Sequence, residues 1–239
     1  SLGKTSFVLD IARHVAIKEN KPVGFFSLEM SREQIMDRLI SAESTVPLSS
    51  LRTGRVNSEV DFELIQKALD TFSRAPIFID DTPMPNILQM RSMARRLQAE
   101  HGLSLLVIDY LQLIQPRTNS DNIVQQITEI SRNIKGLARE LNVPVIAVSQ
   151  LSRQVEQRES KVPRLADLRD SGSIEQDADV VMFLYRKDRE KMNPTPEEQG
   201  TAEIIVSKHR NGPLGVVKLK FDEQKATFKS IDSFHSNGA

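Results

Sequence analysis

The sequence of 239 residues contains no cysteine, which excludes disulfide bonds and metal sites built on thiolates. This absence fits a protein of the reducing cytoplasm, and we expect the chain to be cytoplasmic. No stretch stays apolar over enough residues to span a bilayer, so we expect no membrane partner.

Excess charge and aromatic residues are also lacking. The chain carries 32 Lys+Arg and 32 Asp+Glu, so any contact with a polyanion must be local. It has no tryptophan, two tyrosines and an aromatic content of 5%, which argues against a surface that stacks the bases of a single strand. If the chain holds nucleic acid, we expect it to do so through phosphates.

A phosphate-binding loop is present only in part. Gly3, Lys4 and Thr5 match the end of the GxxxxGK[ST] pattern, but the glycine that opens this pattern would fall before residue 1. The 239 residues suit one large domain. We therefore expect a single domain over residues 1–239, truncated at its N-terminus inside the phosphate-binding loop.

The hydrophobic pattern predicts an α/β fold. Apolar residues at helical spacing predict a helix over 5–20, whose first N–H groups would face a bound phosphate. Strands and helices then alternate as far as residue 150, which indicates a mostly parallel central sheet with helices on both faces. The strands predicted at 103–110 and 143–150 contain hardly a polar residue, so both are expected to be covered on both faces.

The pattern changes after residue 150. Residues 152–179 form a polar stretch whose length suggests a functional loop. Three strands follow, at 180–186, 202–210 and 215–221, and an Asn-Gly turn joins the last two. We expect these to be antiparallel strands at the C-terminal end.

Polar side chains end the strands predicted in the first part of the chain: Glu29, Asp80 and Asp81, Asp109, and Gln150. Ligands of open α/β sheets bind beyond these carboxyl ends. Phosphoryl transfer needs a lysine on the phosphates, a hydroxyl and a carboxylate for Mg²⁺, and a base for the water. Lys4, Thr5, Asp109 and Glu29 supply these types.

Each assignment has an alternative. Asp80 or Asp81 could take the Mg²⁺ role of Asp109, but Asp109 ends the longer and more apolar strand; either run could instead end in a turn-capping aspartate.

Ser31 and Gln34 match the capping-box pattern and predict a helix start just after Glu29. Glu29 could be a solvated acid near this helix start. Gln150 could be a plain strand-end amide or, with Arg153 behind it, a sensor of the γ-phosphate.

Lys208 and Arg210 alternate along a predicted strand, so both are expected on one face just before the Asn-Gly turn. They could be solvated edge cations that guard against aggregation. They could also reach into a phosphate site.

Five stretches together resemble the C-terminal motor domain of bacterial replicative DNA helicases of the DnaB type: FFSLEMS, VIDYLQLI, ISRNIKGLARELNVPVIAVSQLSR, RDSGSIEQDADVVMFLYR and KHRNGP. The similarity covers essentially the whole chain in the same order. It implies a RecA-like P-loop ATPase core, a homo-hexameric ring around single-stranded DNA, and 5′ to 3′ movement and unwinding driven by ATP hydrolysis. It also implies a primase and a helicase loader as partners.

The resemblance implies a role for each matching position. Gly3, Lys4 and Thr5 correspond to the nucleotide-binding residues, with Thr5 and Asp109 on Mg²⁺. Glu29 corresponds to the glutamate that activates the attacking water.

Three further positions correspond to coupling residues. Gln150 matches the glutamine that couples the nucleotide state to DNA loops. Lys208 and Arg210 match the lysine and the arginine finger that a subunit donates to its neighbour's ATP.

For DNA, the resemblance implies a backbone-contacting loop with Arg169, Asp170 and Gly172. The charge of this loop argues against simple attraction, because residues 167–179 carry five acids and one arginine. Backbone N–H groups near Gly172, with Arg169, would have to grip the phosphates. Residues 152–164 carry four cations and two acids and could assist, as could Arg117 in a second loop.

Three rival functions remain open on the sequence. A small-molecule P-loop kinase would also use Lys4, Thr5 and Asp109, but no basic lid or acceptor pocket is evident. A RecA-type recombinase-related ATPase would share the fold. A non-hydrolysing adaptor would not need Glu29.

Overall fold

The computed structural model of the chain describes residues 2–56, 58–116, 122–158, 160–190, 195 and 198–231, with the side chains at 153, 154 and 169–172 left out. Arg117, a candidate for DNA contact, lies outside these residues. None of the helices within these ranges is long and apolar enough to cross a membrane.

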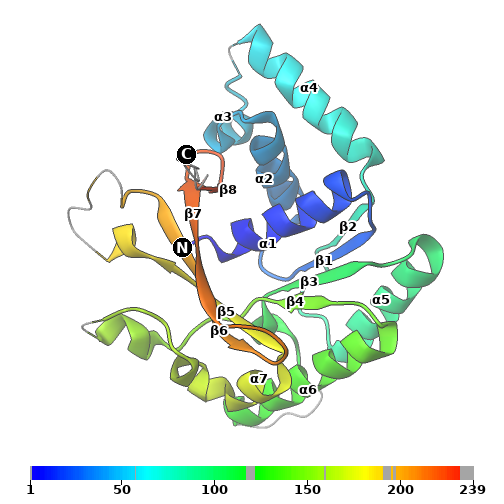
Figure 1. Cartoon of the computed structure of the whole chain (residues 1–239). Coiled ribbons are helices and arrows are strands. Elements are labelled where there is room, and N and C mark those ends of the chain that lie inside the picture. The colour runs from blue at the N-terminus through cyan, green and yellow to red at the C-terminus, as the bar shows by residue number, and fades with distance from the viewer. Residues whose placement is uncertain are drawn as a thin grey trace, which may run out of the picture.

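A four-stranded parallel sheet forms the centre of the molecule, with the strand order β2-β1-β3-β4 (Figure 1). Its strands are β1 (Val23–Ser27), β2 (Ile77–Asp80), β3 (Leu105–Asp109) and β4 (Val145–Ala147). Every residue of β1 and β3 is buried, because these two strands lie inside the sheet and have helices on both faces. The prediction that the strand ending at Asp109 is central and covered is confirmed.

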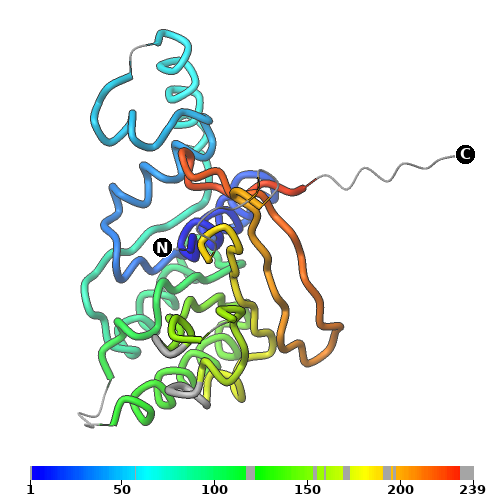
Figure 2. Tube along the Cα trace, turned by 90° about the vertical axis from the view of Figure 1, so that its left-hand side faces the viewer, coloured from blue at the N-terminus to red at the C-terminus, as the bar shows by residue number. Residues whose placement is uncertain are grey.

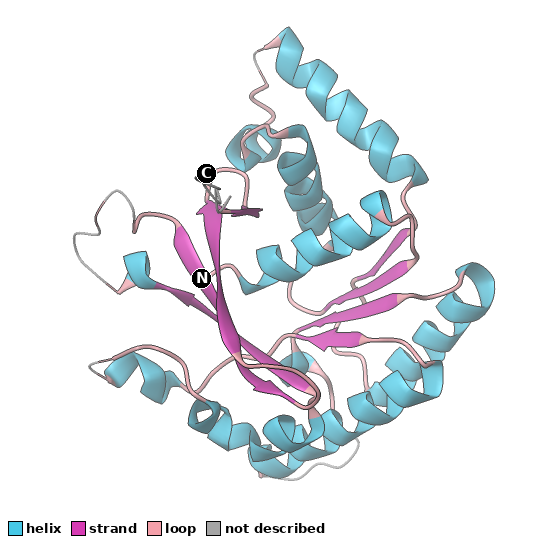
Figure 3. Cartoon of the chain, viewed as in Figure 1, coloured by secondary structure: helices cyan, strands magenta, loops and turns pink. Residues whose placement is uncertain are grey.

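The alternation of side chains along β1 and β3 divides the core into two layers. Phe25 and Val107 point to one face, against α1 (Lys4–Arg13), α2 (Arg32–Ser44) and α4 (Glu59–Arg74). Phe26 and Ile108 point to the other face, against α5 (Ile87–His101) and α6 (Ile123–Leu141). Figure 3 shows these helices (cyan) on both faces of the strands (magenta).

Local signals set the helix boundaries. Helix α1 continues as one π-helical segment, His14–Lys18, so the helix predicted over 5–20 is present. Ser31 and Gln34 form the predicted capping box, in which each side chain bonds to the other residue's backbone N–H. The short helix α3 (Leu48–Thr53) precedes α4 and was not predicted.

The strand predicted over 143–150 differs most from the structure. Strand β4 has three residues, at the edge of the parallel sheet, and is half-buried to exposed. The expectation of a strand covered on both faces is therefore wrong here. An apolar run does not reveal whether a further strand pairs with its outer edge.

A second sheet of four antiparallel strands has the order β5-β6-β7-β8. It comprises β5 (Val180–Arg186), β6 (Thr201–His209), β7 (Gly215–Asp222) and β8 (Thr227–Ser230). Figure 2 shows its long strands along one side of the molecule. Three of these strands match the predicted ones closely, and the expected antiparallel arrangement is confirmed.

The polar stretch before β5 contains short helical segments. These are the 3-10 segments Arg153–Gln157 and Leu165–Ser171, followed by α7 (Gly172–Asp177). Asp167 stabilises the middle of this stretch. Its carboxylate accepts hydrogen bonds from the Arg158 side chain and from the Arg164 backbone N–H, both at 2.7 Å.

Asp10 joins the two sheets through α1. Its carboxylate accepts hydrogen bonds from the hydroxyl of Thr227 at 2.8 Å and from the backbone N–H of Phe228 at 2.6 Å. Burial raises the pKa of Asp10, an effect that these two bonds oppose. Phe7, one turn earlier on α1, meets the Phe228 ring edge-on with the centroids 5.7 Å apart.

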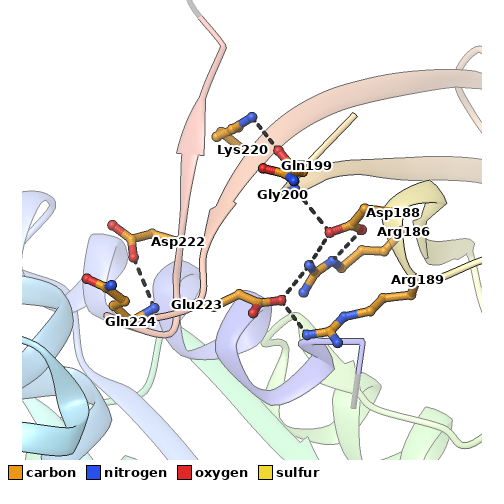
Figure 4. A network of polar contacts seen from close by, with 9 residues as sticks. All are labelled: Arg186, Asp188, Arg189, Gln199, Gly200, Lys220, Asp222, Glu223 and Gln224. Carbon is orange, nitrogen blue, oxygen red and sulfur yellow. Dashed lines mark hydrogen bonds and ion pairs between the residues drawn. The ribbon is translucent and has the colours of Figure 1, made fainter. Parts of the chain in front are cut away.

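A polar network joins the end of β5 to the turn between β7 and β8 (Figure 4). The buried Arg186, at the end of β5, donates to Asp188 at 2.6 Å and to Glu223 at 2.7 Å, and Arg189 also bonds to Glu223. The Arg186 guanidinium lies 4.8 Å from the centroid of the Phe221 ring, which in turn packs on Phe228. The turn between β7 and β8 is thereby fixed to the end of β5.

We expect Asp10→Ala to destabilise the domain by about 2–4 kcal/mol, because Thr227 and the Phe228 N–H would both lose a largely buried acceptor. The free energy of unfolding in urea measures this loss. Asp70→Ala, which removes an exposed aspartate of α4, is the matched control and should change the stability by no more than about 0.5 kcal/mol. Equal stability of the two variants would refute the role given to Asp10.

Candidate nucleotide site

The parallel pairing of β1 with β3 brings two acids to one edge of the sheet. Ser27, the last residue of β1, pairs with Asp109, the last residue of β3. The backbone N–H of Leu28 then donates to the carbonyl of Asp109 at 2.8 Å. Glu29 therefore follows directly at the carboxyl edge on which Asp109 ends.

The first turn of α1 meets the same edge. Gly3 precedes the helix with a φ of 101°, a conformation that residues with a side chain rarely adopt. A Cβ at Gly3 would also lie 3.1 Å from the ring of Phe228 on β8. Glycine is thus required here both by the backbone and by the close approach of the second sheet.

Asp109 and Thr5 are close neighbours. The Thr5 hydroxyl lies near enough to the carboxylate of Asp109, whose residue is only 3% exposed, to lower the pKa of that carboxylate as a hydrogen-bond donor. Burial raises the pKa of Asp109 and the charge of Glu29 adds to the rise, while the Thr5 hydroxyl and the charges of Lys4 and Arg38 oppose it. A buried carboxylate beside a hydroxyl is a pair of hard oxygen donors.

Lys4 lies beside these acids. Its Nζ donates to the carbonyl oxygen of Ser149 at 3.0 Å, which ties the start of α1 to the segment after β4. Burial lowers the pKa of Lys4, and the nearby charges of Asp109 and Glu29 oppose this shift. Lys4, Thr5, Glu29 and Asp109, which the sequence predicted to act together, are thus brought together by the fold.

Gln150 follows Ser149 and is exposed. Its backbone N–H is held by Gln112, a residue that was not predicted from the sequence. The side chain of Gln112 accepts from the Gln150 N–H at 3.2 Å and donates to the Ser149 hydroxyl at 2.9 Å. Gln112 belongs to the 3-10 segment Leu111–Leu113, directly after β3. No pattern in the sequence pairs it with Gln150, which lies 38 positions further along.

Arg38 is a second residue that the sequence analysis missed. It lies on α2, donates to the hydroxyl of Ser6 at 3.3 Å, and is close enough to Asp109 and Glu29 for their charges to act on it. Burial lowers its pKa, and its Nε is buried without a hydrogen-bond partner. Its position in an ordinary amphipathic helix gave no signal, because only the packing of α2 on α1 brings it to the site.

The competing acids are occupied elsewhere. Asp80 accepts from the backbone N–H of Thr82 at 2.9 Å, and Asp81 from that of Arg32 at 2.8 Å. Asp80 therefore caps its own turn, as the turn-capping alternative supposes, whereas Asp81 caps the start of α2, which lies 49 positions earlier in the chain. The proximity of the Thr5 hydroxyl to Asp109 favours Asp109 as the metal-binding acid.

Lys208 and Arg210 contact α7 rather than the Lys4 cluster. Both donate to the carbonyl oxygen of Gln176, Lys208 at 3.4 Å and Arg210 at 2.9 Å, and Lys208 also bonds to the carbonyl of Glu175. They lie side by side, in agreement with the alternation read from the sequence.

The predicted DNA loop coincides with the start of α7. Arg169 and Asp170 belong to the 3-10 segment Leu165–Ser171, and Gly172 is the first residue of α7. The side chains of Arg169 and Asp170 lie outside the described part, so their contacts are not defined.

The donors present suit Mg²⁺ bound together with a nucleotide. Among the described residues, no group of three His, Cys, Asp or Glu could hold a metal ion by itself. Mg²⁺ is commonly held by one or two protein oxygens, with phosphates and water completing its shell. The paired oxygens of Thr5 and Asp109, next to Lys4, fit this arrangement.

The sequence comparisons give a consistent result. The chain matches the family model of the DnaB-like helicase C terminal domain over residues 1–230. It is 49% identical over 233 residues to the replicative DNA helicase DnaB of Geobacillus stearothermophilus, and 48% identical over 233 residues to the replicative DNA helicase DnaC of Bacillus subtilis (strain 168). Each alignment covers 97% of this chain and 51% of the relative, so the chain spans about half the length of these curated relatives.

Solved structures agree with this result. A solved ATPase domain matches with a TM-score of 0.92 at 38% identity, over 97% of this chain and 82% of that chain. A DnaB-like replicative helicase, described with its interactions with primase, matches with a TM-score of 0.92 at 37% identity, over 97% of this chain and 55% of the other. The predicted α/β class is confirmed.

Proposed function

The chain belongs to the family of DnaB-like helicase C-terminal domains, and we propose that it is the ATP-hydrolysing motor of a replicative DNA helicase. In this proposal residues 1–239 form one motor domain. The protein that carries it forms a homo-hexameric ring, translocates 5′ to 3′ on single-stranded DNA and unwinds the duplex ahead. Membership of this family removes the support for the kinase, recombinase and adaptor alternatives.

The observation that carries the proposal is the meeting of Lys4, Thr5, Glu29 and Asp109 at one edge of the parallel sheet. Lys4 and the N–H groups of the first turn of α1 would hold the phosphates of ATP. Thr5 and Asp109 would hold Mg²⁺, which neutralises charge on the phosphates.

Glu29 would receive the proton of the attacking water. It is exposed at the edge where Asp109 is buried, so the two acids suit different tasks. A general base must be reachable by a water molecule beside the phosphate, whereas a metal ligand is better fixed by its surroundings. Gln150, beside the carbonyl that Lys4 contacts, would link this site to DNA-contacting segments.

Lys208 and Arg210 would act on the nucleotide of the neighbouring subunit. In a head-to-tail ring, one face of a subunit meets a different face of the next. Both cations sit near the end of β6 and bond to α7, away from their own Lys4 cluster. An arginine finger that arrives from a neighbour stabilises charge on the transferring phosphoryl group.

For DNA we propose a loop around Arg169, Asp170 and Gly172 that contacts phosphates through backbone N–H groups and Arg169. A primase is a proposed partner, because one solved relative is described with its interactions with primase. A helicase loader is a further proposed partner, which rests on the family resemblance.

The ATPase activity of the full-length protein should rise when single-stranded DNA is added, and Glu29→Gln should remove it while ATP binding is retained. Loss of a positioned base lowers a rate by about 10²–10⁴-fold. Glu33→Gln is the matched control, because Glu33 is an exposed glutamate in the first turn of α2. Single-turnover hydrolysis and a nucleotide-binding assay separate the two effects.

Two results would contradict this proposal. An ATPase that single-stranded DNA does not stimulate would argue against a DNA motor. Hydrolysis near the wild-type rate in Glu29→Gln would remove Glu29 from the mechanism.

Subunit mixing tests the action of Arg210 across the interface. Full-length Lys4→Ala should be inactive, because it lacks the lysine proposed to hold the phosphates. Full-length Arg210→Ala should also be inactive, because an arginine finger supplied in trans contributes about 10³–10⁵-fold in rate. Mixed rings place an intact Lys4 site next to an intact Arg210 at some interfaces. The mixture should therefore recover part of the DNA-stimulated ATPase.

The control mixture combines Lys4→Ala with Glu29→Gln. Both substitutions damage the same site within a subunit, so no interface of the mixed ring is complete and the activity should stay absent. If subunit exchange is verified and the Lys4→Ala and Arg210→Ala mixture is equally inactive, Arg210 does not act in trans.

A further inference from the structure

The pairing of β5 with β6 fixes Asp179 opposite Arg210. Val180 at the start of β5 pairs with His209 at the end of β6, and the Arg210 N–H donates to the carbonyl oxygen of Asp179 at 2.9 Å. The residues just beyond both strands are therefore held together by the backbone. A register shift between Val181 and Met182 marks an irregularity close to this end, and such irregularities commonly re-aim side chains.

The Asp179 carboxylate bridges two cations. One oxygen lies 3.5 Å from Nε of Arg210, and the other bonds to the Nζ of Lys135 on α6. Lys135 lies one helical turn beyond Ser131, whose hydroxyl donates to Asp177 at 2.7 Å. The same face of α6 thus holds both acids that flank Ala178.

The Arg210 guanidinium has a second fixed partner. Its Nη2 donates to the carbonyl oxygen of Gln176 at 2.9 Å, in the last turn of α7. The side chain is nonetheless 45% exposed, so it remains open to a ligand from outside the chain. A long flexible side chain is held in a defined direction while its end stays accessible.

We propose that Asp179 is a positioning residue for Arg210. Its carboxylate, held by Lys135, directs the guanidinium and links that direction to α6 and α7. This inference rests on the proposed action of Arg210 on the neighbouring subunit's nucleotide. An arginine that is already ordered loses less conformational freedom when it engages a phosphate in the transition state.

The test is Asp179→Asn in the full-length protein, which keeps the size of the side chain and removes its charge. The kcat of DNA-stimulated ATP hydrolysis should fall about two- to five-fold, the range for one partly exposed ion pair. The KM for ATP should not change, because the subunit's own nucleotide site is intact. Asp179→Glu, which retains the charge, should recover at least half of the loss.

Asp177→Asn is the matched control. Asp177 lies at the same helix end and bonds to Ser131, not to Arg210, so this variant should retain the wild-type kcat. Melting temperatures of the two variants should be similar. An equal loss of kcat in both would overturn the inference, because the effect would then be structural.

A double variant separates this inference from the proposal on which it rests. In an Arg210→Ala background, Asp179→Asn should cause no further loss in single-turnover hydrolysis. A further loss of the same size would mean that Asp179 acts elsewhere and would overturn the inference. Full ATPase activity of Arg210→Ala itself would overturn both the role of Arg210 and this inference. A loss of ATPase activity in Arg210→Ala without any loss in Asp179→Asn would overturn this inference alone.

Discussion

The parallel register of β1 with β3 is the constraint on which the site depends. Because Ser27 pairs with Asp109, both strands end at one level and Glu29 emerges beside the metal-binding candidate. A shift by one residue would turn Asp109 to the opposite face of the sheet, away from Thr5. Buried side chains on both faces of these strands oppose such a shift.

Two cations, Lys4 and Arg38, lie near two acids, Asp109 and Glu29, at this edge of the sheet. Burial raises the pKa of Asp109 and lowers that of Lys4, so it works against the charged form of each. Lys4 and Arg38 oppose the shift of Asp109, and the acids oppose the shifts of the two cations. A phosphate group and a divalent cation would each supply a further opposite charge, so we expect the site to favour a metal-bound nucleotide over either component alone.

The sequence predicted those features that depend on local pattern. The apolar run ending at Asp109 indicated an interior strand, and Ser31 with Gln34 indicated a helix start; both are present. Lys208 and Arg210 were predicted on one face, and both reach the carbonyl of Gln176.

Features made by tertiary packing were not predictable. Strand β8 was missed because Thr227 and Phe228 are held by Asp10, more than two hundred residues earlier in the chain. Arg38 and Gln112 join the site only because α2 and the segment after β3 are packed against it. The edge position of β4 was missed because an apolar run does not report how many neighbours a strand has.

Thr5 and Asp109 are proposed to hold a divalent cation together with a nucleotide. Titration of Mn²⁺ into the full-length protein in the presence of ADP, followed by electron paramagnetic resonance, tests this role. Asp109→Asn should weaken Mn²⁺ binding by at least about ten-fold, while Asp81→Asn, which removes a capping acid, should leave it unchanged. Unchanged Mn²⁺ affinity in Asp109→Asn, or a loss confined to Asp81→Asn, would show that Asp109 does not bind the cation.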